Sequence, residues 1–169
     1  MLPTPCIPWL AALGLGLSGC AAKPPAAPPA VEPTFYKSLA AKGARVDQDA
    51  ARDMISLYRS NKGLGALAID PALQRTAQAQ AEAMARAGSV DAGRTPLKAR
   101  LSQNGASASA SAENVSAGYY TLAEAFSGWR DSKPHNANML KRDMRRMGIA
   151  TAYAPNAKYK VYWALVLAD

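Results

Sequence analysis

Apolar residues recur every three or four positions from Asp47 onward, the spacing of one face of a helix. This pattern predicts a first helix that ends near Asn61-Lys62-Gly63, where Gly63 can adopt the left-handed conformation that often follows a helix. The apolar positions of the stripe are Ala51, Met54, Ile55 and Tyr58.

A second helix is predicted over residues 72–87, where alanine dominates. Asp70-Pro71 combines an N-cap carboxylate with a proline in the first turn, and Gly88 suits the C-terminal end. Its small residues permit close packing. The expected buried positions are Leu73, Ala77, Ala81 and Met84.

Shorter features fill the middle of the chain. Thr95-Pro96 repeats the cap-and-proline pattern and predicts a helix through Leu101. Residues 102–112 are Ser, Ala, Asn, Gly and similar residues without periodicity, which indicates a flexible loop. Residues 113–118 have the length of a short strand. Thr121-Leu-Ala-Glu124 has capping-box spacing and predicts a helix through Trp129.

Two strand-like runs follow Gly148, at residues 149–153 and 159–167. Pro155 and Asn156 between them suit a turn, so a terminal hairpin is predicted. The second run is apolar on both faces beyond Lys160, as in a strand that helices cover on both sides. Helices first and a small sheet last predict an α+β layered domain.

The N-terminal residues resemble a bacterial lipoprotein signal. Residues 1–19 carry no charge, and an apolar run over residues 7–17 has the length of a secretory signal's hydrophobic region. It ends in Leu17-Ser18-Gly19-Cys20, which resembles the lipobox in which cleavage precedes a lipidated cysteine. The alternative is a buried helix that happens to end in a cysteine. Such signals usually have a Lys or Arg before the apolar run, and none is present here.

Five prolines among residues 21–33 favour an extended tether of roughly 40 Å. We therefore expect a signal peptide at 1–19, the lipidated Cys20 and tether at 20–46, and one domain at 47–169. With Cys6 removed and Cys20 lipidated, this domain of roughly 120 residues has no disulfide and depends on its own core.

The formal net charge is +8, and all of it lies in the mature part. This charge suits an anionic partner such as lipid headgroups or a wall polymer, although a solvated basic helix face has the same pattern. A nucleic-acid partner is not expected, because no aromatic residues alternate with the basic ones. The basic residues concentrate at Lys133, Lys141, Arg142, Arg145 and Arg146.

His135 is the single histidine, which excludes chemistry or zinc binding that needs two imidazoles. Glu113, in Ala112-Glu113-Asn114-Val115, is a candidate carboxylate partner. Two interpretations stay open for His135: a packed residue at a helix start, or part of a functional polar cavity. Ser132 lies three residues before His135, so it is either a helix N-cap or a weak hydrolase candidate.

The order of these motifs resembles the CAP superfamily of cysteine-rich secretory, antigen 5 and pathogenesis-related 1 proteins, in its cysteine-free bacterial branch. The resemblance covers residues 48–169 and implies a three-layer α-β-α sandwich with a small, mainly antiparallel sheet and a cleft. The segments that carry it are Gly63-Leu-Gly-Ala-Leu67, Asp70-Pro-Ala-Leu73, Ala112-Glu-Asn-Val115, Trp129-x-x-Ser132-x-x-His135-Asn-x-Asn-Met-Leu140, Gly148-Ile-Ala150 and Tyr162-Trp163.

Metal-binding members of this family use two histidines and two acids in the cleft. The resemblance places Glu113 at one acid and His135 at the second histidine, implies Asp91 in place of the first histidine, and puts the other acid near Ser132. Together with Asn114, these residues form the expected cleft, in which His135 and Glu113 meet. Because zinc prefers imidazole and thiolate ligands, no metal and no cofactor are expected.

Three functions follow as hypotheses. The first is a non-catalytic, lipid-anchored envelope module that binds a lipid, a cell-wall component or a protein. The second is a cleft hydrolase with His135 as general base, oriented by Glu113. The third is an envelope scaffold without a small ligand. In each case we expect a monomer that Cys20 anchors to a bacterial membrane, facing the periplasm from the outer membrane.

Overall fold

The computed structural model describes residues 32–93 and 95–169. One four-stranded sheet has the strand order β1-β3-β4-β2. β1 runs parallel to β3, whereas β4 pairs antiparallel with both β3 and β2. The mainly antiparallel sheet is therefore confirmed, and so is the terminal hairpin. The strands are β1 (Ala68–Ile69), β2 (Ser111–Ala117), β3 (Arg146–Tyr153) and β4 (Val161–Ala168).

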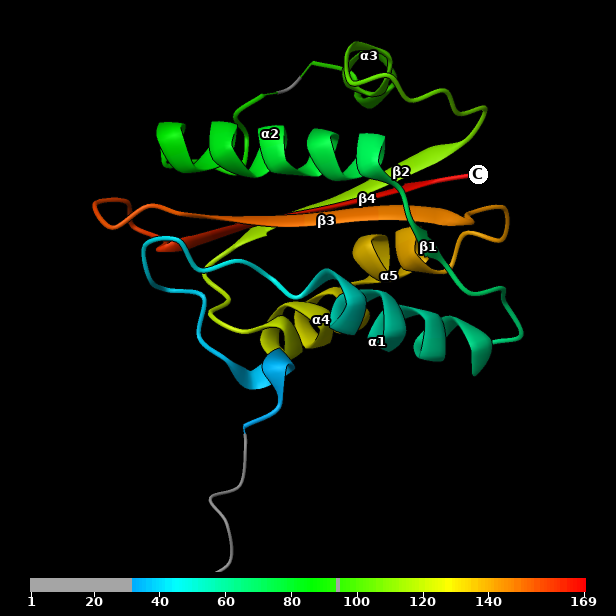
Figure 1. Ribbon diagram of the computed structural model, residues 1–169, viewed down its shortest axis with the longest axis horizontal. Coiled ribbons are helices and arrows are strands. Elements are labelled where there is room, and N and C mark those ends of the chain that lie inside the picture. The colour runs from blue at the N-terminus through cyan, green and yellow to red at the C-terminus, as the bar shows by residue number, and fades with distance from the viewer. Residues whose placement is uncertain (1–31, 94) are drawn as a thin grey trace, which may run out of the picture. The chain divides into compact units, whose positions relative to one another are not determined.

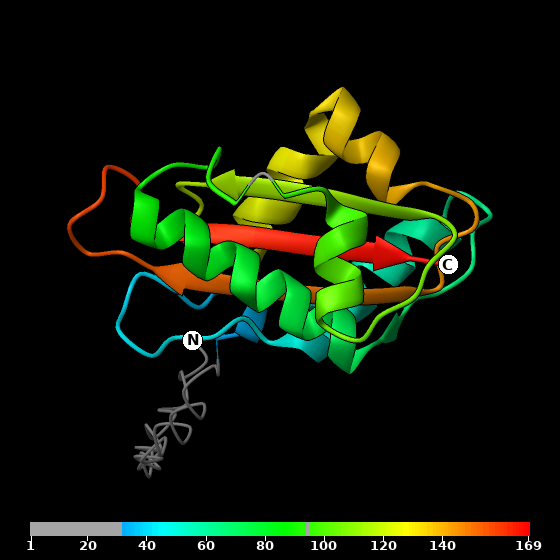
Figure 2. The same ribbon diagram turned by 90° about the horizontal axis from the view of Figure 1, so that it is seen from above.

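Helices cover both faces of the sheet, as Figures 1 and 2 show. α2 and α3 lie on one face, and α1, α4 and α5 lie on the other. This arrangement confirms the α+β class and the three-layer α-β-α sandwich. The helical segments are the 3₁₀ turn η1 (Thr34–Tyr36), α1 (Gln48–Ser60), α2 (Pro71–Ala87), α3 (Leu97–Gln103), α4 (Leu122–Asp131) and α5 (Lys133–Met139).

Side-chain caps fix where three of the helices begin. The carboxylates of Asp47 and Asp70 accept backbone N–H bonds at the starts of α1 and α2, and Thr121 forms the predicted capping box with Glu124. The cap predicted at Thr95 is wrong, because α3 begins at Leu97 after Pro96 and has no side-chain cap.

The core lies on both sides of β4, whose eight residues are all buried. On the side of α1 and α4, the rings of Trp129 and Trp163 meet edge to face with centroids 6.1 Å apart. On the other side, the predicted stripe of α2 is fully buried against alternate residues of the sheet. The prediction of a strand covered on both faces is confirmed.

α2 packs unusually close to β3. A Cβ added to Gly148 would lie 2.3 Å from the backbone nitrogen of Gln74, so only glycine fits at this contact. The Gln74 side chain then pairs with the backbone of Ile149, accepting from its N–H at 2.9 Å and donating to its carbonyl at 2.8 Å. Gln74 thus takes the position of a neighbouring strand beside β3.

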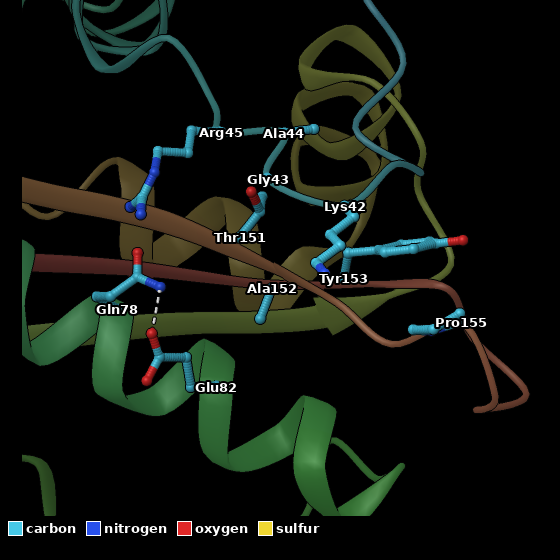
Figure 3. Close-up of a pocket in the computed structure, with 10 residues that line it drawn as sticks. All are labelled: Lys42, Gly43, Ala44, Arg45, Gln78, Glu82, Thr151, Ala152, Tyr153 and Pro155. Atoms are coloured by element: carbon cyan, nitrogen blue, oxygen red, sulfur yellow. Dashed lines mark hydrogen bonds between the residues drawn. The ribbon is translucent and has the colours of Figure 1, made fainter.

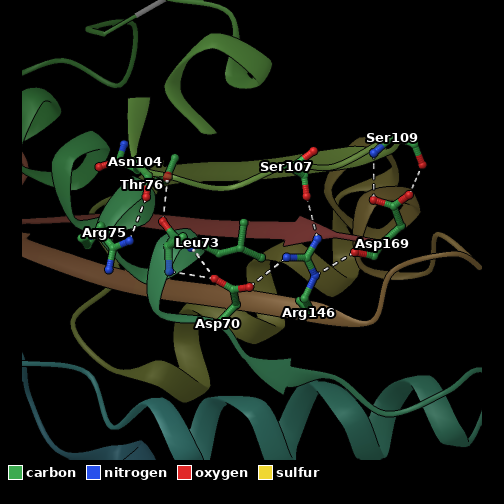
Figure 4. Close-up of polar contacts among 10 residues, drawn as sticks. Asp70, Leu73, Arg75, Thr76, Asn104, Ser107, Ser109, Arg146 and Asp169 are labelled. Carbon is green, nitrogen blue, oxygen red and sulfur yellow. Dashed lines mark hydrogen bonds and ion pairs between the residues drawn. The ribbon is translucent and has the colours of Figure 1, made fainter. Parts of the chain in front are cut away.

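Residues 102–112 are more ordered than the predicted flexible loop. Their ends belong to α3 and β2, and Arg146 binds the carbonyl of Ser107 at 2.9 Å (Figure 4). Arg146 also donates to the Asp70 carboxylate at 2.9 Å and to the carbonyl of Asp169, whose own carboxylate accepts from Ser109. Side-chain contacts with residues far away in the sequence hold this segment in place. Its order could not be predicted from local periodicity.

The same network sets the charge state of Asp70. Burial alone would raise the pKa of its carboxyl group, but the backbone N–H groups of Leu73 and Ala72 and the Arg146 guanidinium hold that pKa below its usual value. Asp70 therefore stays ionised at neutral pH and caps α2 while it pairs with Arg146.

The packed domain begins before residue 47, so the boundary expected there is too late. Leu39 and Val46 are buried in the core on the α1 side, and the N–H of Leu39 donates to the carbonyl of Tyr120 at 2.7 Å. The predicted signal peptide, Cys20 and residues 21–31 of the expected tether lie outside the described residues. Within the described ranges, no helix has both the length and the apolar character needed to span a bilayer.

Candidate functional site

Glu113 lies on β2 with its carboxylate held by Arg100 of α3. Two guanidinium nitrogens of Arg100 donate to the two carboxylate oxygens, at 2.9 and 2.7 Å. The Arg100 and Glu113 side chains are only 14% and 17% exposed, and the Arg100 Nε also donates to the carbonyl of Thr95 at 2.9 Å. Such a two-point pair fixes both side chains and compensates the negative charge. Glu113 is therefore poorly placed to act as a free base.

A cavity of about 390 Å³ opens beside this ion pair. Asp91 lies on the same cavity as Glu113, so the structure brings together two of the five expected cleft residues. Gln80 of α2 shapes the wall by donating to the carbonyl of Ala92 at 2.9 Å. The lining residues are Gln80, Val90, Asp91, Ala92, Gly93, Leu97, Arg100, Glu113 and Val115.

Asn114 points to the opposite face of β2 and is fully buried against α5. Its amide donates to the carbonyl of His135 at 3.0 Å, and its side-chain oxygen accepts from Asn138 at 3.0 Å. Asn138 donates in addition to the backbone carbonyl of Glu113 at 3.0 Å. The Glu-Asn motif thus has two separate roles: the acid faces the cavity, and the amide attaches α5 to the sheet.

His135 does not meet Glu113, which corrects the expected pair. Successive side chains of a strand point to opposite faces, and only Asn114 of the motif faces α5. The half-buried His135 ring forms no hydrogen bond or ion pair with any residue in the two described ranges. Burial lowers its pKa, so the imidazole is neutral at pH 7.

Ser132 occupies the N-cap position of α5, but its hydroxyl makes no capping bond. Its backbone carbonyl accepts from the N–H of Asn136 at 2.8 Å, and no hydrogen bond joins its hydroxyl to His135. Ser132 and His135 do not line the cavity beside Glu113. The Ser/His arrangement of a hydrolase is therefore not formed.

Arg100 and Gln80 are the site residues that the sequence analysis missed. Arg100 falls within the short helix that the sequence predicts, one residue before the buried Leu101. A usable signal was the need of a half-buried carboxylate at Glu113 for a cationic partner. Gln80 carried a signal too, because it lies beside the predicted apolar stripe of α2.

Comparison with known families agrees with this architecture. The model of the cysteine-rich secretory protein family, CAP, matches residues 52–167. The chain belongs to the CAP family. No curated protein sequence matches it.

Three solved structures share the fold. An extracellular SCP-domain protein of Bacillus anthracis superposes with a TM-score of 0.61 at 21% identity, over 72% of this chain and 39% of that one. A cysteine-rich secretory protein of Staphylococcus aureus gives 0.59 at 21% identity, over 72% and 37%. An outer surface protein of Borrelia burgdorferi gives 0.63 at 17% identity, over 71% and 90%. The match thus spans about two fifths of the first two proteins and most of the third.

The CAP cleft of this chain does not fit the metal site of the family. Asp91 and Glu113 share the cavity, but Arg100 holds the Glu113 carboxylate and His135 lies outside. In the described part of the chain, no group of three or more His, Cys, Asp or Glu side chains is arranged to hold a metal ion. The residues present are a poor ligand set for zinc.

We predict that the purified CAP protein retains far less than one equivalent of zinc after dialysis at neutral pH. Elemental analysis measures this directly, with His135→Ala as the matched control. A full equivalent of zinc that disappears in His135→Ala would contradict the prediction and restore the metal-dependent enzyme hypothesis.

Proposed function

We propose that this protein is a lipid-anchored envelope module whose CAP domain binds a polar cell-wall component without catalysis. The observation that carries the proposal is the ion pair between Arg100 and Glu113. Because Arg100 holds the Glu113 carboxylate, the carboxylate that was expected to orient His135 is not available to it. The same ion pair places charged hydrogen-bond donor and acceptor groups on the cavity wall. Such a surface suits hydroxyl and amide groups better than a lipid chain, because burying charged groups against hydrocarbon is unfavourable.

The proposed location rests on the N-terminal sequence. An apolar run followed by Leu17-Ser18-Gly19-Cys20 supports cleavage before Cys20 and attachment of lipid to its sulfur. Residues 21–32 then separate the membrane from the packed domain. The extracellular and outer-surface names of the Bacillus and Borrelia proteins support a place in the envelope, which we put at the periplasmic side of the outer membrane.

The basic cluster contributes less than its sequence suggests. Its members do not share a helix face, because Lys133 lies in α5, residues 141–145 connect α5 to β3, and Arg146 begins β3. Arg146 also forms an ion pair with Asp70. The exposed side chains of Lys133, Arg142 and Arg145 remain for an anionic lipid or wall polymer. We propose that a monomer uses them as a weak, salt-sensitive contact.

Cys20→Ser should move the protein from the detergent phase to the aqueous phase in a detergent partition of whole cells. The thiol is the attachment point of the lipid, and serine provides none. Cys6→Ser is the matched control, because this residue lies in the expected signal peptide and should leave the protein in the detergent phase. If Cys20→Ser protein remains in membranes, another anchor holds it.

Binding is tested with soluble glycan-peptide fragments of peptidoglycan and the Cys20→Ser protein. Saturable binding is expected by calorimetry, and Val115→Phe should weaken it more than tenfold by filling the cavity with a ring. His135→Ala, outside the cavity, should bind as the parent does. Absence of binding by the parent would contradict the proposal and favour the scaffold hypothesis.

The same fragments separate binding from hydrolysis. The fragments should be recovered unchanged after incubation, by mass spectrometry, with either the parent or His135→Ala. Turnover by the parent that His135→Ala abolishes would establish the cleft hydrolase instead. A screen with activity-based probes on the same two proteins extends the test to substrates other than wall fragments.

A further inference from the structure

On the edge of β3 that faces away from β4, only the first two residues of β3 have a neighbouring strand. β1 pairs only with Arg146 and Met147, and the Gln74 side chain then pairs with Ile149. Backbone groups alternate in direction along a strand, so those of Thr151 and Tyr153 point to the same side as those of Ile149. Within the described chain this edge therefore presents an N–H and a C=O at each of two positions, spaced as in a β-ladder.

A cavity of about 530 Å³ lies along this open edge, larger than the cavity beside Glu113. Figure 3 shows the loop of residues 42–45 on one side and α2 on the other, with β3 between them. The volume of this cavity falls in the range that holds a small ligand. The lining residues are Lys42, Gly43, Ala44, Arg45, Gln78, Glu82, Thr151, Ala152, Tyr153 and Pro155.

Thr151 is among the residues that line this cavity, and its buried hydroxyl lacks a hydrogen-bond partner. Thr151 is 7% exposed, and its Oγ1 is buried with no hydrogen bond to any group in the described residues. The hydroxyl points toward the loop of residues 42–45 (Figure 3). Buried polar groups are nearly always hydrogen-bonded, so an unpaired hydroxyl beside an open strand edge indicates a ligand that completes the bonding.

The charges around the cavity set the chemistry of that ligand. Lys42 and Arg45 are exposed, and neither forms an ion pair with another residue in ranges 32–93 and 95–169. The opposite wall is different, because Glu82 accepts from Gln78 at 2.8 Å and lies 3.7 Å from Arg86. Among the described residues, the wall formed by Lys42 and Arg45 therefore carries two cationic groups without an ion-pair partner, and that wall suits an anionic group.

We propose that this edge of β3 binds a short, extended peptide that ends in a free carboxylate. The peptide backbone pairs with the N–H and C=O groups of Thr151 as an added strand. The Thr151 hydroxyl bonds to the peptide, and Lys42 and Arg45 receive the terminal carboxylate. This site lies apart from the cavity of Asp91 and Glu113, so it does not depend on the function proposed there.

The test is an NMR titration of ¹⁵N-labelled Cys20→Ser protein with L-alanyl-alanyl-alanine, compared with the same tripeptide carrying a C-terminal amide. Saturable shifts are expected at the amides of residues 44–45, 151 and 153. The amidated peptide should bind at least tenfold more weakly, because it lacks the charge that Lys42 and Arg45 recognise. No saturable shift at these amides, or equal affinity for both peptides, overturns the proposal.

Variants assign the contacts. Arg45→Gln should lower the affinity for the free acid toward that for the amide, whereas Lys62→Gln, an exposed lysine outside the cavity, should leave it unchanged. Thr151→Val should weaken binding about fivefold, the effect of one hydrogen bond, without lowering the melting temperature. The unchanged melting temperature follows because the valine replaces an unpaired hydroxyl.

One further outcome bears on the proposed contacts and another on the class of ligand. Unchanged affinity in both Arg45→Gln and Thr151→Val overturns the proposed contacts. A disaccharide of N-acetylglucosamine that shifts the same amides and binds as tightly as the tripeptide overturns the assignment to a peptide.

Discussion

Arg59→Met should lower the free energy of unfolding by at least about 4 kcal/mol, a large part of the stability of a small domain. The Arg59 guanidinium is fully buried and donates to the carbonyls of Gly65, Met139, Lys141 and Met144, at 2.7–2.9 Å. Methionine fills a similar volume but donates to none of them. Each buried carbonyl left unpaired costs about 1–3 kcal/mol.

Urea denaturation of parent and variant measures the loss. Arg52→Met is the matched control on the same helix, since Arg52 pairs only with exposed acids and its loss should cost less than about 1 kcal/mol. Arg59→Lys should recover only part of the stability, because an ammonium cannot reach four carbonyls in the plane of a guanidinium. Equal stability of Arg59→Met and Arg52→Met would contradict this interpretation.

Trp129→Ala should cost about 3–5 kcal/mol, the range for removing a large buried aromatic side chain. Trp129 is fully buried against Trp163, and its Nε1 donates to the Ser116 hydroxyl at 3.0 Å. The variant loses the ring contact and leaves a cavity between α4 and the sheet. Truncation of Trp163, whose Nε1 donates to the carbonyl of Tyr119 at 2.8 Å, should have a similar effect.

Thermal and urea unfolding of Trp129→Ala test this value. Leu57→Ala provides the control, because Leu57 is an exposed apolar residue on α1 and its truncation should change stability little. Trp129→Phe should fall between parent and Trp129→Ala, since it keeps most of the ring and loses the bond to Ser116. A cost below about 1 kcal/mol for Trp129→Ala would show that the packing around this ring is wrong.

The sequence predicted the elements whose causes are local. The predicted caps at Asp70 and Thr121 act within one turn of their helices, and the apolar stripe of α2 repeats every three or four residues. The prediction that Thr95 caps α3 was wrong because its cap-and-proline pattern is equally compatible with a helix that begins after Pro96. β1 was not predicted, since a two-residue strand has no period to detect.

Contacts between residues far apart in the sequence could not be predicted from local patterns. No periodicity in residues 34–46 shows that Leu39 and Val46 join the core. The expected meeting of His135 and Glu113 failed because the resemblance supplied neighbours but not the face of β2 from which each side chain points. Arg59 carried a visible signal, since it continues the four-residue spacing of Ala51 and Ile55, which are buried on α1.

The place of β4 in the sheet has a consequence for how the chain can be made. β4 lies between β3 and β2, yet it follows both in the sequence, so neither of them has its principal pairing partner until residues 161–168 have been synthesised. A nascent chain that lacks those residues cannot close its sheet or bury either core. The pairings on both sides of β4, and with them the two cores, can therefore form only once residues 161–168 are available.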